Sequence, residues 1–361
     1  MLRELPALGA PERILSVSPR PFSAAGLVRT AHGNVFIKRH HRTVRDREGL
    51  LEEHGFLAHL QTHGAPVPRV LASASGETAI GQGEWTYEVH ETGDGVDLYE
   101  DAFSWTPFRC ARHAYAAGQA LARLHLASTG YSALRRNVRP LVASFTIFAS
   151  ADPAREMENY LIARPALASH KAVRACAKQA LGLLAPFHAE LAPRLSALAP
   201  LWTHNDLHAS NLLWSDYSDS AGAAAIIDFG LADRTNAVHD IAHAIERNIV
   251  EWLALVADPA HPDDVPVHFD HLDALLVGYE SIRPLSMNEA AALAPMAALC
   301  HAEFALSESD YFLSVLHAED KAPMAYNGWL VGHARWFHSK QGRKLLDSLR
   351  RRADAHVETA P

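Results

Sequence analysis

The sequence predicts an α+β protein with two lobes: a small, β-rich N-terminal lobe with one main helix, and a larger, mostly helical C-terminal lobe. Three observations lead to this expectation. Short apolar runs separated by turn residues fill the first ninety positions. A Gly-containing break follows at residues 92–95. From residue 102 onward, Ala- and Leu-rich stretches have helical periodicity. We therefore expect an N-terminal lobe of residues 1–91 and a C-terminal lobe of residues 92–361, and 361 residues leave room for two cores.

In the N-terminal lobe, β-rich runs alternate with turn residues and one long helical stretch. The run at 27–30 and the run at 35–38 flank Ala-His-Gly-Asn, which is typical of a hairpin. A turn of small residues at 23–26 precedes them. Residues 44–63 carry leucines and a phenylalanine at helical spacing, and the prolines at 66 and 68 end this helix. The expected strands are 14–17, 27–30, 35–38, 67–72 and 85–90.

For the C-terminal lobe, the sequence predicts a series of helices with one interruption. The interruption is 201–230, where short strand-like runs at 211–214 and 225–227 alternate with polar turns. A polar loop enclosed by helices is well suited to carrying a functional site. The expected helices are 110–127, 170–198, 236–257, 268–282, 287–318 and 322–352.

Composition excludes several classes of protein. The formal net charge is -8 and no basic stripe runs along the chain, which argues against a nucleic-acid partner. No apolar run approaches the length of a membrane span, and the first fifteen residues lack the apolar core of a signal peptide. The cysteines Cys110, Cys176 and Cys300 are few and widely separated, which indicates reduced thiols in a cytoplasmic protein. Oligomeric state is left open.

The most informative residues lie in 203–214 and 226–230. Asn211 follows Asp206 by five positions, and Asp228 follows a short apolar run. Phosphoryl transfer from ATP uses such a set, because one carboxylate orients the attacking hydroxyl while an amide oxygen and a second carboxylate hold Mg²⁺ on the phosphates. We therefore assign Asp206 as the catalytic base, and Asn211 and Asp228 as metal ligands. Taken singly, Asp206 also fits a helix N-cap and Asp228 a turn-initiating residue.

Lys38 ends the run Val-Phe-Ile-Lys, and a lysine on a central strand can reach the α- and β-phosphates of ATP. Such a lysine needs a carboxylate to hold it. Glu53 on the following helix is the best candidate. The alternatives are a surface lysine on an edge strand and a solvated helix carboxylate.

Two further segments are candidates for nucleotide contacts. Ser23 and Gly26 bound a small-residue turn whose backbone N–H groups could approach phosphate, although the full glycine-rich motif is absent. A plain hairpin turn is the alternative. Val89 and Glu91 would form the hinge, with backbone groups pairing with the adenine edge, and an ordinary interlobe strand is the alternative.

His239 and His243 lie four residues apart, as in a zinc-protease helix, but the Glu of that motif and a third ligand at the right spacing are missing. The pattern therefore gives little support to the hypothesis of a zinc hydrolase. In the alternative interpretation, Asp240 supports the catalytic loop from a helix N-terminus and the two histidines are packed or solvated. Several acidic residues cluster as a solvated face or, alternatively, as a pocket for a cationic substrate: Asp94, Asp97, Glu100, Asp101, Glu303, Glu308 and Asp310.

These motifs resemble those of the aminoglycoside phosphotransferase and choline kinase-like superfamily of small-molecule kinases, with a homoserine-kinase-type layout. The resemblance covers most of the chain, through 35–38, residue 53, 67–71, 118–125, 204–214, 226–230, residue 240, 278–279, 284–286 and residue 289. It implies a protein-kinase-like bilobal fold and MgATP-dependent phosphorylation of a hydroxyl. It also implies Asp206 as base, the two metal ligands above, Lys38 paired with Glu53, and structural support from His204 and Asp240.

Asn205 stands where this superfamily commonly has Gly, and Asn tolerates a left-handed backbone. A protein kinase is disfavoured, because only about ten residues separate 228–230 from the helix near Asp240 and no Ala-Pro-Glu follows. We expect an O-phosphotransferase whose acceptor is an amino alcohol, a hydroxy amino acid or an aminoglycoside. A catalytically silent, nucleotide-binding regulatory pseudokinase is the alternative. One sequence identifies neither the acceptor nor a preference between ATP and GTP.

Overall fold

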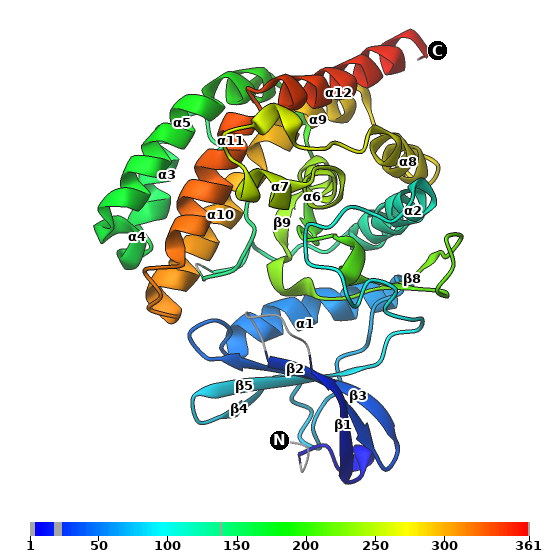
Figure 1. Cartoon of the computed structure of the whole chain (residues 1–361). Helices are drawn as coiled ribbons and strands as arrows, with labels where there is room; N and C mark the ends of the chain where they lie inside the picture. The colour runs from blue at the N-terminus through cyan, green and yellow to red at the C-terminus, as the bar shows by residue number, and fades with distance from the viewer. Residues whose placement is uncertain (1–3, 18–23, 138, 360–361) are drawn as a thin grey trace.

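In the computed structural model, a β-sheet with one helix forms the N-terminal lobe, and helices form most of the C-terminal lobe (Figure 1). The two-lobed α+β prediction is confirmed. The structure describes residues 4–17, 24–137 and 139–359. The strands are β1 (Pro11–Val17), β2 (Ala24–Thr30), β3 (Gly33–His41), β4 (Ile80–Gln82), β5 (Trp85–Glu91), β6 (Pro200–Thr203), β7 (Leu212–Trp214), β8 (Ala223–Ile226) and β9 (Asp233–Asn236). The α-helices are α1 (Arg47–Thr62), α2 (Ala111–Ser128), α3 (Pro153–Ile162), α4 (Pro165–Ser169), α5 (Lys171–Leu191), α6 (Ala237–Ile249), α7 (Trp252–Ala257), α8 (Phe269–Glu280), α9 (Met287–Leu299), α10 (His301–Asp310), α11 (His333–Trp336) and α12 (Lys340–Thr359).

The five-stranded sheet of the N-terminal lobe has the order β1-β2-β3-β5-β4, with every neighbouring pair antiparallel. β3 lies in the middle, so Lys38 is opposite Ala25 on one side and Glu88 on the other. The turn predicted at 23–26 is wrong from Ala24 onward. Gly26 is a strand residue paired with Ile37, because the hairpin ladder continues to Arg39. Ser23 lies outside the described residues.

Helix α1 begins where the side chain of Asp46 accepts from the Gly49 N–H at 2.8 Å, an N-cap that satisfies one of the unpaired helix-start donors. It packs its apolar face, which includes Phe56, against the main core of the molecule. The strand predicted at 67–72 forms only as a single bridge between Val70 and His90. The neighbouring prolines at 66 and 68 lack the N–H groups that a longer ladder would require.

In the C-terminal lobe, α2 and α8 approach closely because glycines face each other. A Cβ on Gly118 would lie 2.0 Å from the Leu275 carbonyl oxygen, and one on Gly278 would lie 2.1 Å from that of Tyr115. The segment Met287–Val315 is long and apolar enough to span a membrane, contrary to the sequence-based expectation that no such run exists. An 18-residue apolar window of this segment is 94% buried inside the protein, as a core helix would be.

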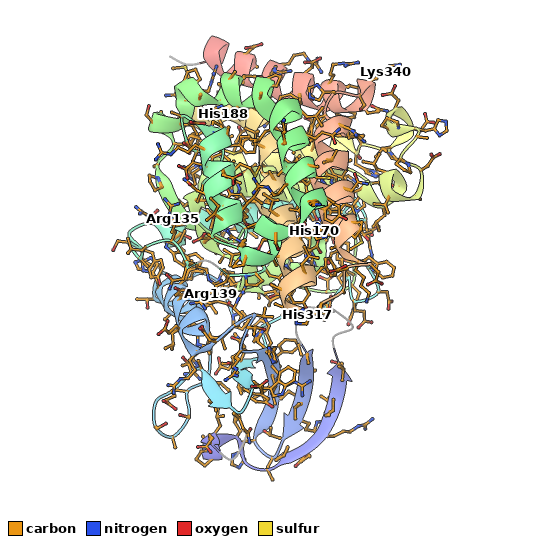
Figure 2. All side chains as sticks on the ribbon, turned by 90° about the vertical axis from the view of Figure 1, so that its left-hand side faces the viewer. Arg135, Arg139, His170, His188, His317 and Lys340 are labelled. Atoms are coloured by element: carbon orange, nitrogen blue, oxygen red, sulfur yellow. The ribbon has the colours of Figure 1, made fainter. Side chains whose placement is uncertain are left out.

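Figure 1 shows α1 lying between the sheet and the C-terminal lobe. Figure 2 shows Arg139 beside α1 at this junction, and its Nη1 donates to the Asp46 carboxylate at 2.7 Å. The segment that carries Arg139 therefore ties the start of α1 to the C-terminal lobe.

Candidate active site

Helix α6 is the support on which the loop at 204–209 is built. Asp240 accepts from two consecutive backbone N–H groups, that of His204 at 2.8 Å and that of Asn205 at 2.7 Å. About two turns farther along α6, the Asn248 side chain accepts from the Ala209 N–H at 3.0 Å and donates to the Leu207 carbonyl at 2.8 Å. These side chains fix both ends of the loop. His125 Nε2 lies 3.0 Å from the Asp240 carboxylate. Burial alone would raise the pKa of Asp240, but the hydrogen bonds from His125 and from the His204 backbone lower it.

Asn205 adopts the left-handed conformation, with φ of 61°. This is the position where the resemblance leads one to expect Gly, so Asn meets the same backbone requirement. Its buried Oδ1 accepts from the Thr203 hydroxyl at 2.8 Å and lies 3.1 Å from His239 Nδ1. The side chain therefore adds hydrogen bonds to the loop that a glycine would lack.

Asp206 contacts Arg247 on α6 and Asn211 from the end of its own loop. Its Oδ1 accepts from Arg247 Nε at 2.9 Å, and its Oδ2 lies 3.3 Å from Asn211 Nδ2. Burial raises the pKa of Asp206, and the Arg247 guanidinium opposes that rise. Because Nδ2 of Asn211 is directed to Asp206, the side-chain oxygen is the Asn211 atom suited to a cation.

Asp228 also has a left-handed backbone, with φ of 62°, and follows strand β8. Its Oδ1 lies 3.0 Å from Lys38 Nζ, which joins the two lobes across the site. Burial disfavours the charge of Lys38, but the carboxylates of Asp228, Glu88 and Glu53 outweigh it and raise the pKa of Lys38. Lys38 is therefore an ammonium at any physiological pH.

His204 couples the base to the segment that carries Asp228. Its Nε2 lies 2.9 Å from the Ile227 carbonyl, and its Nδ1 accepts from the Asp206 N–H at 3.2 Å. One neutral tautomer, with the proton on Nε2, makes both hydrogen bonds. The ring thus sets the distance between the two carboxylate-bearing segments.

The structure does not form the expected direct pair between Lys38 and Glu53. Glu53 is buried, and its ion pair is with Arg136 Nη2 at 3.7 Å, while Lys38 pairs with Asp228. The reason is that Arg136 lies between α1 and the Asp-Phe-Gly turn, where it also donates to the Gly230 carbonyl at 3.1 Å. Glu53 acts on Lys38 only through its charge.

Arg136 and Arg45 are functional candidates that the sequence reasoning missed. Both donate to the Gly230 carbonyl, Arg45 at 2.6 Å, so two buried guanidinium groups hold the turn after Asp228. Arg136 also donates to the Gly49 carbonyl of α1 at 2.7 Å. Irregular segments carry both residues, and such segments have no periodicity that would mark a buried arginine.

Two of the backbone groups that the hinge prediction at Val89 and Glu91 invoked are already paired with a neighbouring segment. The Val89 carbonyl accepts from the Leu71 N–H at 2.7 Å, and the Glu91 N–H donates to the Arg69 carbonyl at 2.9 Å. The segment 69–71 runs alongside β5 and occupies these groups, so they do not face an adenine. The Val89 side chain is part of the small N-terminal core.

Arg247 is the most important residue that the sequence reasoning missed. It lies seven residues after Asp240, on the same face of α6, and a charged residue at that spacing in a buried helix is the signal that could have found it. Its guanidinium carbon lies 4.4 Å from the Phe304 ring centre. Arg247 Nη2 and Glu308 Oε2 are both buried and, among the described residues, have no hydrogen-bond partner. Glu308 is the acidic candidate that feels the charge of Asp206. Glu303 instead accepts from the Ile147 N–H at 2.6 Å.

His239 and His243 do not form a metal site with a third residue in the part of the chain that the structure describes. Both rings are buried, 4.6 Å apart between centres. Burial lowers the pKa of His239 to about 3 and that of His243 well below its usual value, so both are neutral. They belong to the packing beneath the loop, where His239 contacts Asn205.

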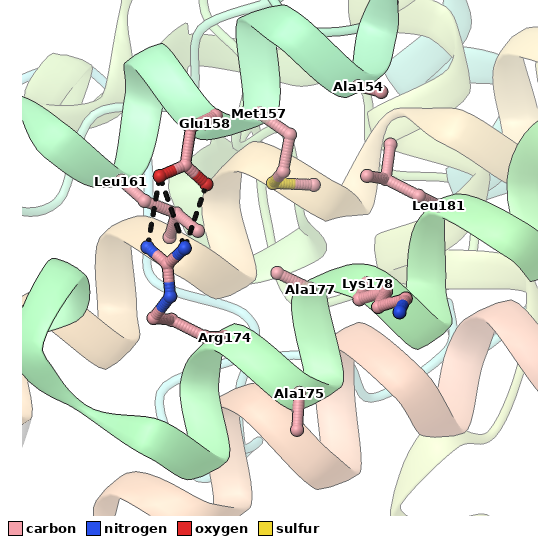
Figure 3. A pocket seen from close by; sticks show the side chains of 9 residues that line it. All are labelled: Ala154, Met157, Glu158, Leu161, Arg174, Ala175, Ala177, Lys178 and Leu181. Carbon is pink, nitrogen blue, oxygen red and sulfur yellow. Dashed lines mark hydrogen bonds and ion pairs between the residues drawn. The ribbon is translucent and has the colours of Figure 1, made fainter.

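A pocket elsewhere on the molecule holds none of these residues (Figure 3). It lies between α3 and α5, where Glu158 and Arg174 form an exposed ion pair at 3.1 Å. Its other lining residues are Ala154, Met157, Leu161, Ala175, Ala177, Lys178 and Leu181. It has no arrangement of groups that would move a proton or a phosphate.

The chain matches the model of the phosphotransferase enzyme family over residues 23–285. No curated protein matches it by sequence. Among solved structures, amicoumacin kinase hAmiN in complex with AMP-PNP, Ca²⁺ and Ami aligns at 15% identity, covering 92% of each chain with a TM-score of 0.58. The microcompartment-associated aminopropanol kinase aligns at 18% identity, covering 91% of this chain and 93% of its own, with a TM-score of 0.58. A thermostable mutant of aminoglycoside phosphotransferase APH(4)-Ia aligns at 14% identity over 93% and 98%, with a TM-score of 0.53. These likenesses confirm the predicted kinase-like bilobal fold.

Proposed function

Because the chain belongs to the phosphotransferase enzyme family, whose members include small-molecule kinases, we propose that it transfers the γ-phosphate of ATP to a hydroxyl group of a small molecule. The observation that carries this proposal is the meeting of Asp206, Asn211, Asp228 and Lys38 from separate segments of both lobes. A protein that only binds nucleotide has no use for a buried carboxylate with a raised pKa beside the metal ligands.

Asp206 is the proposed base. Its carboxylate would accept a hydrogen bond from the acceptor hydroxyl, hold that oxygen in line with the γ-phosphorus, and take its proton as the new O–P bond forms. A raised pKa brings the base closer to neutral pH, where proton acceptance is more effective. The bond from Arg247 keeps the carboxylate ionised and fixes its orientation.

Asn211 and Asp228 would hold Mg²⁺, since an amide oxygen and a carboxylate are the hard oxygen donors that this ion prefers. Bound Mg²⁺ would neutralise charge on the β- and γ-phosphates. Lys38 now pairs with Asp228, and an ammonium on a flexible stem is able to turn from that carboxylate to a phosphate oxygen. The residue types at these four positions therefore suit a nucleotide held with Mg²⁺.

For the acceptor, we propose a small hydroxyl compound that also carries an amino group, such as an amino alcohol, a hydroxy amino acid or an aminoglycoside. Glu308 supports this choice, because one oxygen of this buried carboxyl has no partner among the described residues and a bound ammonium would favour its ionised form over the protonated form that burial favours. Arg247 Nη2 is a second unsatisfied group at the same place and favours an acceptor that also bears a carboxylate or another acceptor oxygen. We propose a cytoplasmic location, where thiols stay reduced, since all three cysteines are free.

An ATP-consumption screen tests this function. Purified protein with MgATP is incubated with amino alcohols, hydroxy amino acids, aminoglycosides and unmodified sugars, and ADP release is measured. The expected result is acceptor-dependent ADP release with an amine-bearing hydroxyl compound and a phosphomonoester product found by mass spectrometry. Tight MgATP binding with no acceptor-dependent turnover across the screen would instead favour the regulatory pseudokinase.

A further inference from the structure

A second buried cluster of ligating side chains lies in the N-terminal lobe, apart from the residues proposed for catalysis. Glu88 on β5 is fully buried and lies among three imidazoles. His54 Nε2 is 2.8 Å and His90 Nε2 is 2.9 Å from Glu88 Oε2, and His40 Nε2 is 3.0 Å from Oε1. The three ligand atoms of His54, Glu88 and His90 all lie within 4.8 Å of one another. Strands β3 and β5 and helix α1 thus meet at one carboxylate.

Hydrogen bonds alone do not account for this arrangement. His40 and His54 are placed to donate to Glu88, but the buried Nε2 of His90, although 2.9 Å from Oε2, has no hydrogen-bond partner among the described residues. Its direction is therefore unsuited to a proton shared with that oxygen. A cation bound by His54, Glu88 and His90 would give this buried nitrogen a partner.

We propose that His54, His90 and Glu88 bind a zinc ion. Two imidazole nitrogens and a carboxylate are common zinc ligands, and ligand atoms in a tetrahedral site lie about 3.4 Å apart for bonds of about 2.1 Å. The observed separations of 2.8 and 2.9 Å require the side chains to open by roughly 0.5 Å, which small rotations provide.

Two outer contacts fit the same assignment. His54 Nδ1 lies 2.8 Å from the Thr78 hydroxyl, and a metal-binding histidine usually has its other nitrogen held in this way. His40 would hold the second oxygen of Glu88. The ion would link α1 to the sheet. Its ligand His54 is next to Glu53 in sequence, and its ligand Glu88 pairs with Lys38 in the register of β3 and β5. Its binding is independent of the proposed kinase activity.

The test uses the full chain without an affinity tag. Protein stripped with a chelator is titrated with zinc against a chromophoric zinc chelator, in millimolar Mg²⁺ to fill other cation sites. We expect one tight zinc per chain. Glu88→Gln and His90→Gln should weaken it about 100-fold or more, and Thr78→Val, which removes only an outer contact, about tenfold. Zinc should also raise the melting temperature of the wild type but not that of Glu88→Gln.

Two control variants separate this site from other places where zinc could bind. Asp228→Asn removes a ligand of the proposed catalytic site, and His268→Gln disrupts the more exposed group of His268, Asp270 and His271. Both should keep the tight zinc. If Glu88→Gln does not fold, two other measurements still test whether zinc binds at this site. One is the zinc affinity of Thr78→Val, and the other is the visible spectrum of the cobalt-substituted wild type, which reports the coordination geometry. The proposal is overturned if the stripped protein binds no zinc tightly, or if Thr78→Val has no effect while a control variant loses the ion.

Discussion

Arg247 Nε donates to Asp206 Oδ1 at 2.9 Å, and the same buried guanidinium contacts the carboxylate of its neighbour Glu246. The Arg247 guanidinium thus fixes the carboxylate of the proposed base and itself lies against the Phe304 ring. This contact sets both the orientation of Asp206 and the pH at which it is ionised, because Arg247 opposes the rise in pKa that burial causes.

Arg247→Gln should shift the pH profile of kcat/KM. Without the guanidinium, the pKa of Asp206 rises further, so the ascending acid limb should move to higher pH by roughly 1–2 units, since a charge-assisted bond contributes about 1.5–3 kcal/mol. Arg247→Lys keeps the charge and should shift the limb less. Arg335→Gln, at an exposed position, is the control and should leave the profile unchanged. An unmoved acid limb in a folded Arg247→Gln protein would remove Arg247 from this role.

Asn205→Ala and Asn205→Gly separate backbone strain from hydrogen bonding. Both variants lose the bonds from Thr203 and His239, but only Ala must also adopt φ near 61°. The free energy of unfolding in urea should therefore fall for both, and further for Ala by about 1–2 kcal/mol. Equal loss in the two variants would show that the left-handed backbone carries no cost here.

Glu308 should make stability depend on pH. Burial raises the pKa of Glu308 to about 8, Arg247 partly opposes this, and Asp206 adds to it. A carboxyl whose pKa is raised on folding favours the folded state below its ordinary value of 4.5 and loses that contribution as pH rises to about 8. Relative to Glu308→Gln, the wild type should lose roughly 3–5 kcal/mol of unfolding free energy across this range. Parallel stability curves would contradict the burial argument, and Glu319→Gln, at an exposed site, is the control.

Much of the fold follows from local sequence signals. The hairpin of β2 and β3 is encoded by a Gly-containing turn between apolar runs, and α1 by an Asp cap and a leucine-rich face. What failed depends on neighbours in space. The segment at 67–72 has strand-like residues, but Pro66 and Pro68 and a short contact with β5 leave it a single bridge. The short pair β6 and β9 was missed, because four-residue strands carry too little pattern to detect.

The candidate site divides in the same way. Asp206, Asn211 and Asp228 are recognisable because the chemistry requires fixed spacing within short loops. Arg45, Arg136 and Arg247 act through contacts over many residues of sequence, such as Arg136 with Gly230, which no single-sequence pattern reports. The predicted ion pair between Lys38 and Glu53 is wrong for the same reason, because Arg136, distant in sequence, forms the ion pair with Glu53 instead.

The most direct measurement is the turnover of Asp206→Asn with the acceptor found by the screen, together with its affinity for MgATP. If Asp206 is the base, kcat should fall by about 10²–10⁴-fold, while MgATP binding measured by calorimetry stays within a few-fold of the wild type. The matched variant Asp216→Asn, on an exposed turn, should retain full turnover. An Asp206→Asn protein that keeps wild-type kcat would contradict the central claim that this carboxylate accepts the proton of the acceptor hydroxyl.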